Sequence, residues 1–217
     1  MRLNRESYSV LITGLGGQGV LLVSKIIAAA AGQSHAFVCR TESRGLSQRG
    51  GSVCSDVRFG PQPVAPVIGS GTADVILSLD ALEATRVLHL LKPNGLLLTN
   101  IHFVAPLHLV AGWRVENREK EQHTALDRQL MSIIAARCEA YTLDLSNLAN
   151  SAQCERGVNL ALLGAAVRFL PFPEGHLRAA LMSLAKPQHL EQSLRAFDAA
   201  CKAVPTPLVD NGRALTA

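Results

Sequence analysis

Three glycines near the start of the chain have the spacing of a phosphate-binding turn. Gly14, Gly16 and Gly19 satisfy the pattern G-x-G-x-x-G between an apolar run at residues 8–13 and a longer one at residues 20–31. The first run predicts a buried strand and the second, rich in Leu, Ile and Ala, predicts a helix. In such a turn the first glycine permits the tight bend, the second lets a pyrophosphate approach, and the third lets the helix pack on the strand. Free amides at the helix start, with the helix dipole behind them, favour an anion there.

The glycine turn by itself leaves two interpretations open. A nicotinamide dinucleotide site also needs an acidic residue at the end of the second strand, about 20 residues further on. The predicted second strand, residues 36–41, is followed by Glu42, which comes after an Arg and a Thr and opens a loop. The chain could therefore be a stand-alone NAD-binding dehydrogenase or redox-sensing protein. In the other interpretation the turn only docks a helix on a sheet.

A polar loop with the sequence ESRGLSQRGGSV follows at residues 42–53. It sets Arg44 and Arg49 among glycines, together with Gln48 and Ser52. Such a donor-rich loop can clasp a carboxylate or a phosphate, or the backbone of a neighbouring subunit. Its composition equally fits a solvated surface loop.

Together the glycine turn and the polar loop resemble the gamma-type subunit or domain of the 2-oxoacid:ferredoxin oxidoreductases, and most closely the small subunit of their indolepyruvate branch. In that family the loop usually reads Glu-x-His-Gly-Met-Ala/Ser-Gln-Arg-Gly-Gly-Ser-Val, whereas this chain has Arg44 for the His and Leu46 for the Met. The resemblance is good over residues 8–100, looser to about residue 170 and slight thereafter. Further matching positions are Asp80, Glu83, Ala84, Arg86, Pro93, Gly95 and Asn159.

The resemblance implies a subunit of an enzyme that oxidatively decarboxylates a 2-oxoacid. Such enzymes use thiamine diphosphate with magnesium, coenzyme A, and [4Fe-4S] clusters that pass electrons to ferredoxin. The Gln before Arg49 is typical of the aryl-pyruvate branch, so the implied substrate is an aryl 2-oxoacid such as indolepyruvate.

The cofactor ligands that this chemistry needs are missing from the chain. A thiamine diphosphate site needs acidic metal ligands, and clusters need sets of cysteines. No two of the five cysteines lie within four residues of one another, and no Gly-Asp-Gly motif occurs. We therefore expect thiamine diphosphate, magnesium and clusters mainly on a larger partner subunit. No cofactor or metal is assigned to this chain alone, and the isolated chain is expected to be inactive.

The candidate cofactor-binding residues come from the turn and the loop, and no catalytic residue or metal ligand is assigned. We expect the turn either to be architectural or to help hold the coenzyme A or diphosphate end at a subunit interface. Because Arg44 replaces the His of the family, any ligand role of that His does not carry over. The candidates are Gly14, Gly16, Gly17, Gln18, Gly19, Arg44, Gln48, Arg49 and Ser52.

The alternation of strands and helices up to residue 100 predicts an α/β fold. We expect a Rossmann-like three-layer domain with a mostly parallel sheet, a helical C-terminal part at about 155–203, and a single domain over residues 1–217. The expected strands are 8–13, 36–41, 52–60, 74–79, 96–100 and 139–143, and the expected helices are 20–31, 81–91, 119–136, 157–169, 175–185 and 188–203.

Composition argues against several other classes of protein. Aromatic residues make up only 4% of the chain and the net charge of +4 is scattered, which disfavours a nucleic-acid partner. The polar first nine residues do not fit a secretory signal. No apolar run reaches the roughly 18 residues of a membrane span. Five cysteines without a signal favour reduced thiols, so we expect a cytoplasmic protein.

Overall fold

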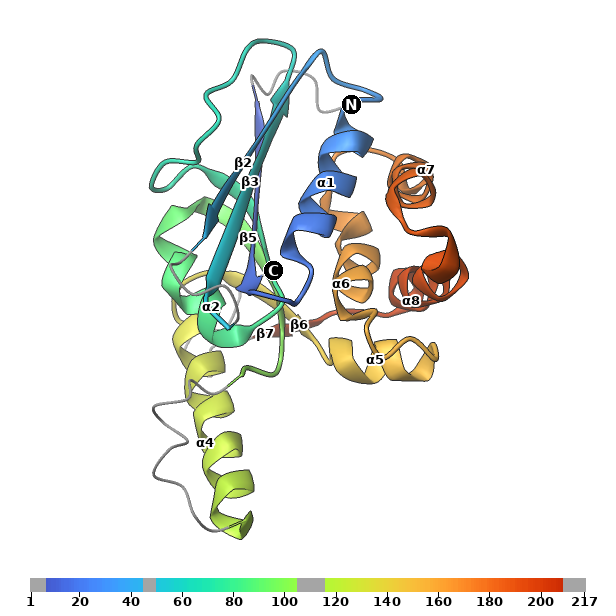
Figure 1. The fold of residues 1–217 in the computed structure, drawn as a ribbon. Coiled ribbons are helices and arrows are strands. Elements are labelled where there is room, and N and C mark those ends of the chain that lie inside the picture. Colours follow the sequence, from blue (N-terminus) through green and yellow to red (C-terminus); the bar gives the residue numbers. More distant parts are fainter. Residues whose placement is uncertain (1–6, 45–49, 105–115, 209–217) are drawn as a thin grey trace.

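A single seven-stranded sheet organises the chain (Figure 1). The computed structural model describes residues 7–44, 50–104 and 116–208, with only the backbone described for residue 44 and for residues 116–125. The strand order is β2-β3-β1-β4-β5-β6-β7. The strands are β1 (Tyr8–Leu15), β2 (Phe37–Arg44), β3 (Ser52–Gly60), β4 (Ala73–Ser78), β5 (Leu91–Asn100), β6 (Glu139–Leu143) and β7 (Thr206–Leu208).

The direction of the strands makes the sheet mixed but mostly parallel. β1, β4, β5 and β6 pair in parallel, and β3 pairs antiparallel with both β1 and β2. β2 therefore runs in the same direction as β1, and only β3 and β7 oppose the rest. The carboxyl ends of five strands thus lie at one edge, where ligands bind in open α/β sheets.

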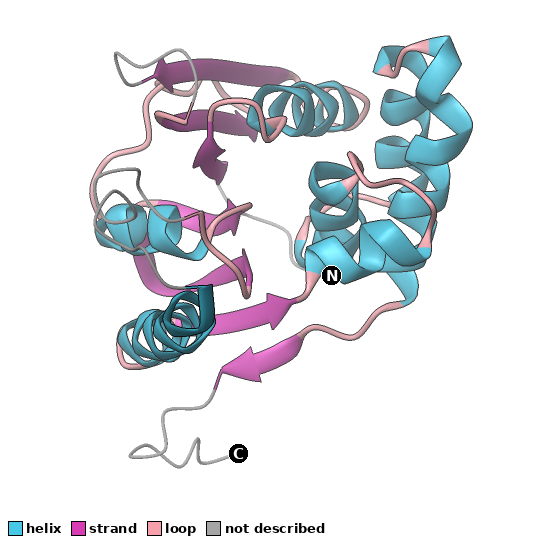
Figure 2. Cartoon of the chain, turned by 60° about the horizontal axis from the view of Figure 1, so that its bottom comes forward, coloured by secondary structure: helices cyan, strands magenta, loops and turns pink. Residues whose placement is uncertain are grey.

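Helices cover both faces of this sheet, which gives three layers (Figures 1 and 2). One face carries α1 and α6, with α7 packed on α1 and α8 packed on α6, and the other face carries α2 and α4. The helices are α1 (Val20–Ala31), α2 (Ala81–Val87), α4 (Glu116–Ala135), α5 (Leu145–Ser151), α6 (Val158–Ala166), α7 (Glu174–Leu184) and α8 (Leu190–Lys202). Short 3-10 turns follow α2 (Leu88–Leu90) and α6 (Val167–Phe169) and precede α8 (Pro187–His189).

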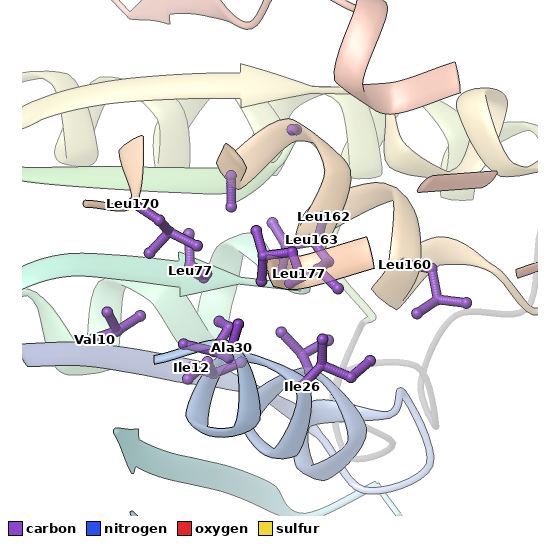
Figure 3. Packing of buried hydrophobic residues seen from close by; sticks show 14 of the residues in the cluster. Val10, Ile12, Ile26, Ala30, Leu77, Leu160, Leu162, Leu163, Leu170 and Leu177 are labelled. Atoms are coloured by element: carbon purple, nitrogen blue, oxygen red, sulfur yellow. The ribbon is translucent and has the colours of Figure 1, made fainter. Parts of the chain in front are cut away.

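The larger core lies between the sheet and the α1–α6 layer (Figure 3). Ile12 of β1 and Leu77 of β4 meet Ile26 of α1 and Leu163 of α6, and all four side chains are fully buried. Burying such a side chain contributes about 1.5–3 kcal/mol. Because β1 and β4 are covered on both faces, they are buried along nearly their whole length. This packing fixes the strand ends that carry the site.

Most predicted elements are confirmed, but the sheet around β1 differs from a simple βαβ succession. The prediction that β2 ends at residue 41 is wrong, because β2 continues to Arg44 and Glu42 lies within it. β3 lies between β1 and β2 and runs antiparallel to both. α2 ends at Val87 rather than at residue 91, and β5 begins already at Leu91. α5 and β7 were not expected from the sequence.

His35, just before β2, gives the fold a dependence on pH. Its ring lies 4.7 Å from that of Phe59, its Nε2 is buried without a hydrogen-bond partner, and burial lowers its pKa from 6.5. The unfolded chain then binds more protons than the folded chain as the pH falls below 6.5, so the free energy of unfolding decreases there. We expect His35→Phe to remove this part of the pH dependence. Urea unfolding of both chains at several pH values tests it, and identical pH profiles would contradict it.

Candidate functional site

The glycine turn lies at the carboxyl end of β1 and leads into α1. Gly17 and Gly19 have φ angles of 100° and 88°, a left-handed conformation that favours glycine. The Oε1 atom of Gln18 accepts the N–H of Leu15 at 2.7 Å and closes the turn. Among the described residues, nothing accepts the N–H groups of Gly17 and Gly19. These amides are donors that an anion at the start of α1 could use.

Close packing also requires two of these glycines. A Cβ atom on Gly14 would lie 2.7 Å from Oε1 of Gln18. A Cβ atom on Gly19 would lie 2.3 Å from Nδ2 of Asn159, the second residue of α6. The side chain of Asn159 therefore lies against the turn at Gly19, which brings the start of α6 close to the start of α1.

The turn and the polar loop are joined by backbone contacts. Gly14 pairs with Val53 and Leu15 with Ser52 in the β1–β3 ladder. Beyond the end of the ladder, the N–H of Gly16 donates to the carbonyl oxygen of Gly51 at 2.8 Å. The two motifs that stand out in the sequence therefore form one structural unit.

The structure gathers six of the nine candidate residues in this unit. They are Gly14, Gly16, Gly17, Gln18, Gly19 and Ser52. Arg44 is the last residue of β2, where its backbone pairs with Val53, and its side chain is not described. Gln48 and Arg49 lie outside the described residues, so their roles stay predictions.

A buried carboxylate organises the neighbouring strand end. Asp80 follows β4 and is only 1% exposed. Its Oδ1 accepts the N–H groups of Leu82 and Glu83 at 2.9 and 3.1 Å, which caps α2, and its Oδ2 accepts the N–H of Val104 at 2.7 Å. Burial raises the pKa of this carboxyl, and the three hydrogen bonds act in the opposite direction. Asp80 thus ties the segment after β5 to the start of α2.

Polar side chains also end the next two strands of the parallel group. Asn100 of β5 is buried, accepts the N–H of Leu145 at 3.2 Å and donates to the carbonyl of Leu79 at 3.4 Å. Nε2 of His102 lies 3.5 Å from Oδ2 of Asp144, which also caps α5. Sequence reasoning missed Asn100, although its place at the end of a predicted strand was a usable signal.

Two cavities share residues of the α5–α6 connection, and one of them includes the turn in its wall. A cavity of about 520 Å³ at the carboxyl edge is lined by Gly17, Gln18, Asp80, Asn100 and His102, among others. The second, of about 970 Å³, lies between α1, α5, α6 and α8 and includes Asn159 and Ser193 in its wall. Glu155 and Arg156 line both cavities.

The side chains around these cavities suit a polar ligand with an anionic group. Asn159 and Ser193 are 6% and 7% exposed, and no described residue forms a hydrogen bond with either side chain. Arg156, which sequence reasoning also missed, is an exposed cation between the two cavities. The arrangement offers amide and guanidinium donors, with His102 and Glu155 also in the cavity walls.

The sheet order disfavours the dinucleotide interpretation. In a nicotinamide site the acidic residue ends the parallel strand next to β1. Here β3 occupies that position, and β2 lies one strand further away. Glu42 is inside β2 and pairs with Arg40. On the β3 side of β1, no acidic residue therefore ends a parallel strand beside β1, and the turn resembles a dinucleotide site only locally.

The described residues do not fit a bound metal or cluster. They contain no group of three or more His, Cys, Asp or Glu residues that could hold a metal ion. The five cysteines are all free thiols, and burial raises the pKa of Cys138 and Cys201 to about 11. In the part of the chain that is described, no helix combines the length and apolar character of a membrane span.

The fold and the site define an α/β protein whose glycine turn is built into a mixed sheet rather than into a dinucleotide-binding domain. The chain belongs to the pyruvate ferredoxin/flavodoxin oxidoreductase family, whose sequence profile matches residues 9–203. It is 29% identical over 201 residues to the indolepyruvate oxidoreductase subunit IorB of Pyrococcus horikoshii. The alignment covers 91% of this chain and 96% of that protein.

Solved structures of the same kind share the fold. The gamma subunit of a keto/oxoacid ferredoxin oxidoreductase from Geobacter sulfurreducens aligns with a TM-score of 0.63 at 22% identity, covering 89% of this chain and 95% of that one. The 2-oxoglutarate:ferredoxin oxidoreductase of Magnetococcus marinus, solved with 2-oxoglutarate, coenzyme A and succinyl-CoA, aligns with a TM-score of 0.66 at 18% identity. The alignment covers 91% of this chain and 31% of the Magnetococcus chain.

Proposed function

We propose that this chain is the subunit of a 2-oxoacid:ferredoxin oxidoreductase that carries no thiamine or iron–sulfur cofactor. The complex would convert an aryl 2-oxoacid such as indolepyruvate to its acyl-CoA and pass the electrons to ferredoxin. The observation that carries the proposal is the union of the glycine turn with the polar loop, through the Gly16–Gly51 hydrogen bond. The name of the Pyrococcus relative supports indolepyruvate as the substrate.

A larger partner subunit follows from this proposal. Thiamine diphosphate, magnesium and [4Fe-4S] clusters need ligand sets that the described residues do not offer. We place these groups on the partner and treat residues 1–217 as a single domain that assembles with it. Purification of the complex from its native host should therefore bring down a thiamine- and iron-containing polypeptide. Reduction of ferredoxin by the isolated chain with an arylpyruvate would overturn the proposal.

The glycine turn and the 520 Å³ cavity are our candidates for holding the coenzyme A or diphosphate end of a ligand. The donors there are the N–H groups of Gly17 and Gly19, which no described residue accepts, and Arg156 lies in the cavity wall. The Magnetococcus enzyme was solved with coenzyme A, which supports coenzyme A as the ligand. These residues of the chain would bind and orient, and the chemistry would take place on the partner's groups.

Arg49 gives this proposal a direct test. A guanidinium beside Gln48 and two glycines can present its planar donor fork to a carboxylate or a phosphate. Removing a charge-assisted pair costs about 1.5–3 kcal/mol, so Arg49→Ala should lower turnover or coenzyme A affinity about tenfold to a hundredfold. Arg49→Lys should retain only part of the turnover or coenzyme A affinity, since an ammonium cannot form the bidentate contact.

The Arg49 assay uses the reconstituted complex, with gel filtration alongside. Arg195→Ala on the surface of α8 serves as the control, because it also removes a guanidinium but lies away from the turn. A mutant that fails to copurify with the partner would assign Arg49 to the interface instead. Normal assembly with unchanged kinetics would remove Arg49 from the site.

A stand-alone NAD-binding protein is the competing function, and its support is the glycine pattern. Calorimetric titration of NAD and NADH into the purified chain separates the two. We expect no micromolar binding, because antiparallel β3 separates β1 from β2, so Glu42 does not end a parallel strand beside the turn. Micromolar affinity would favour the dinucleotide interpretation over the subunit interpretation.

A further inference from the structure

Within the described part of the chain, β2 forms an uncovered edge of the sheet. It is the terminal strand, and its eight residues pair with β3 in an unbroken register from Phe37–Gly60 to Arg44–Val53. Among the described residues, no strand lies on its other side. None of its described side chains is buried, and Phe37 is 41% exposed. A row of backbone donors and acceptors is therefore available along this edge.

The opposite edge of the sheet is protected in the usual way. β7 has only three residues and contains Pro207. Short strands, prolines, bulges and charges are the devices by which proteins prevent edge-to-edge pairing. β2 has no proline and no bulge, so its only device is the charge of Arg40, Glu42 and Arg44. Charges prevent pairing with an arbitrary strand, but they favour a strand of complementary pattern.

The β2 sequence is complementary to itself. When two copies pair antiparallel about a twofold axis at Thr41, Arg40 of each copy lies directly opposite Glu42 of the second copy. Directly opposed residues share a face of the sheet, so only registers centred on a residue are allowed. Centring on Arg40 would oppose two arginines, and centring on Glu42 would oppose two carboxylates. The register at Thr41 is the one that places Arg40 and Glu42 opposite each other.

The two charged side chains are already held on one face. Nη1 of Arg40 forms an ion pair with Glu42 and lies 3.4 Å from Oγ of Ser24 on α1. Both side chains are 26% exposed, so the pair is partly shielded from solvent. A second copy would turn each pair into half of a four-charge network across the axis, which is stronger than an isolated exposed pair.

We propose that β2 is the docking edge for a second copy of this chain, with the two sheets continuous through antiparallel β2–β2 pairing centred on Thr41. In this arrangement Arg44 of one copy lies opposite Val38 of the other. The polar loop that follows Arg44 would then begin beside the start of β2 in the second copy. Self-association of this chain and the position of that loop are thereby linked.

A charge exchange on the full chain tests the proposal by light scattering after gel filtration and by sedimentation. We expect the wild-type chain to dimerise, and Glu42→Arg alone to weaken the dimer about tenfold to a hundredfold, because two attractive cross-strand pairs become repulsive. The double variant Arg40→Glu/Glu42→Arg should restore dimerisation, since the opposed charges are again opposite in sign. Glu191→Arg on α8, with the original side chain 87% exposed, is the matched control and should leave the dimer intact.

A cysteine on the axis reports the register independently of affinity. In the background Cys39→Ser, the variant Thr41→Cys places two thiols directly opposite each other, within the range of a disulfide. Mild oxidation should give a covalent dimer, whereas Ser43→Cys in the same background should give much less. A monomeric wild-type chain would overturn the proposal, as would a dimer whose stability does not change with the charge exchange. The proposal would also fail if the β2 variants no longer bound the larger subunit while the dimer of this chain stayed intact.

Discussion

Replacing Gly19 with alanine is expected to destabilise the chain by roughly 2–5 kcal/mol. Two effects add at this position. A residue with a Cβ is strained in the left-handed conformation at φ 88°, and the new Cβ would lie 2.3 Å from Nδ2 of Asn159. Asn159 is buried in the first turn of α6, so its side chain must shift to accommodate the methyl group. Urea unfolding of the purified chain measures the loss.

Two variants separate the strain from the clash. At Gly17 the φ angle is 100° but nothing lies within 4 Å of an added Cβ, so Gly17→Ala should cost only the strain, about 1–2 kcal/mol. Asn159→Ala should partly rescue Gly19→Ala, because it removes the atoms that the methyl group meets. If Gly19→Ala and Gly17→Ala were equally stable, the contact with Asn159 would not be what requires glycine.

The order of strands and helices could be predicted from hydrophobic periodicity because the central elements are covered on both sides. β1, β4 and α1 are long apolar runs, and their bounds differ from the prediction by two residues at most. The direction of β3 could not be predicted in this way. An alternating pattern such as SVCSDVRFG shows that one face is half-exposed, but it is the same for a parallel and an antiparallel strand.

The short elements were missed for a related reason. α5 has seven residues and β7 has three, so neither contains enough repeats of its pattern to stand out from a loop. β7 is stabilised by pairing with β6, a contact distant in sequence. The predicted helix 81–91 continues after α2 as a 3-10 turn at Leu88–Leu90 and stops before Leu91, because Leu91 pairs with Ala73 of β4 and strand pairing outweighs helical propensity there.

The site could be predicted from the sequence only where local spacing determines it. The glycine turn belongs to one short segment, so its pattern predicted both its place and its shape. The partners of the turn come from distant segments: Gly51 meets Gly16 through the β1–β3 ladder, and Asn159 meets Gly19 through the packing of α6. Asn100 at the end of β5 and Arg156 in the α5–α6 connection come from still other segments, and both line the cavity at this edge.

The second large effect is expected for Asp80→Ala, which should destabilise the chain by roughly 1–3 kcal/mol. The variant loses the cap of α2, a change that costs about 0.5–2 kcal/mol in helices generally. It also removes the acceptor of the Val104 N–H, a part-buried hydrogen bond whose loss adds about 0.5–1.5 kcal/mol. Because burial raises the pKa of the Asp80 carboxyl, part of the loss is offset by removing a poorly solvated charge. Urea unfolding at neutral pH measures the net effect.

Asp144→Ala is the matched control for Asp80→Ala. Asp144 also caps a short helix, where its Oδ1 accepts the N–H of Asn147 at 2.8 Å, but its side chain is 37% exposed and its other contact is with the exposed His102. We therefore expect a loss of only about 0.5–1 kcal/mol for Asp144→Ala. Asp80→Asn should lie between the two, since its amide oxygen can still cap α2 while its NH₂ group faces the N–H of Val104. Equal losses for Asp80→Ala and Asp144→Ala would mean that the contact with Val104 contributes nothing, and that Asp80 does not hold the segment beside the cavity.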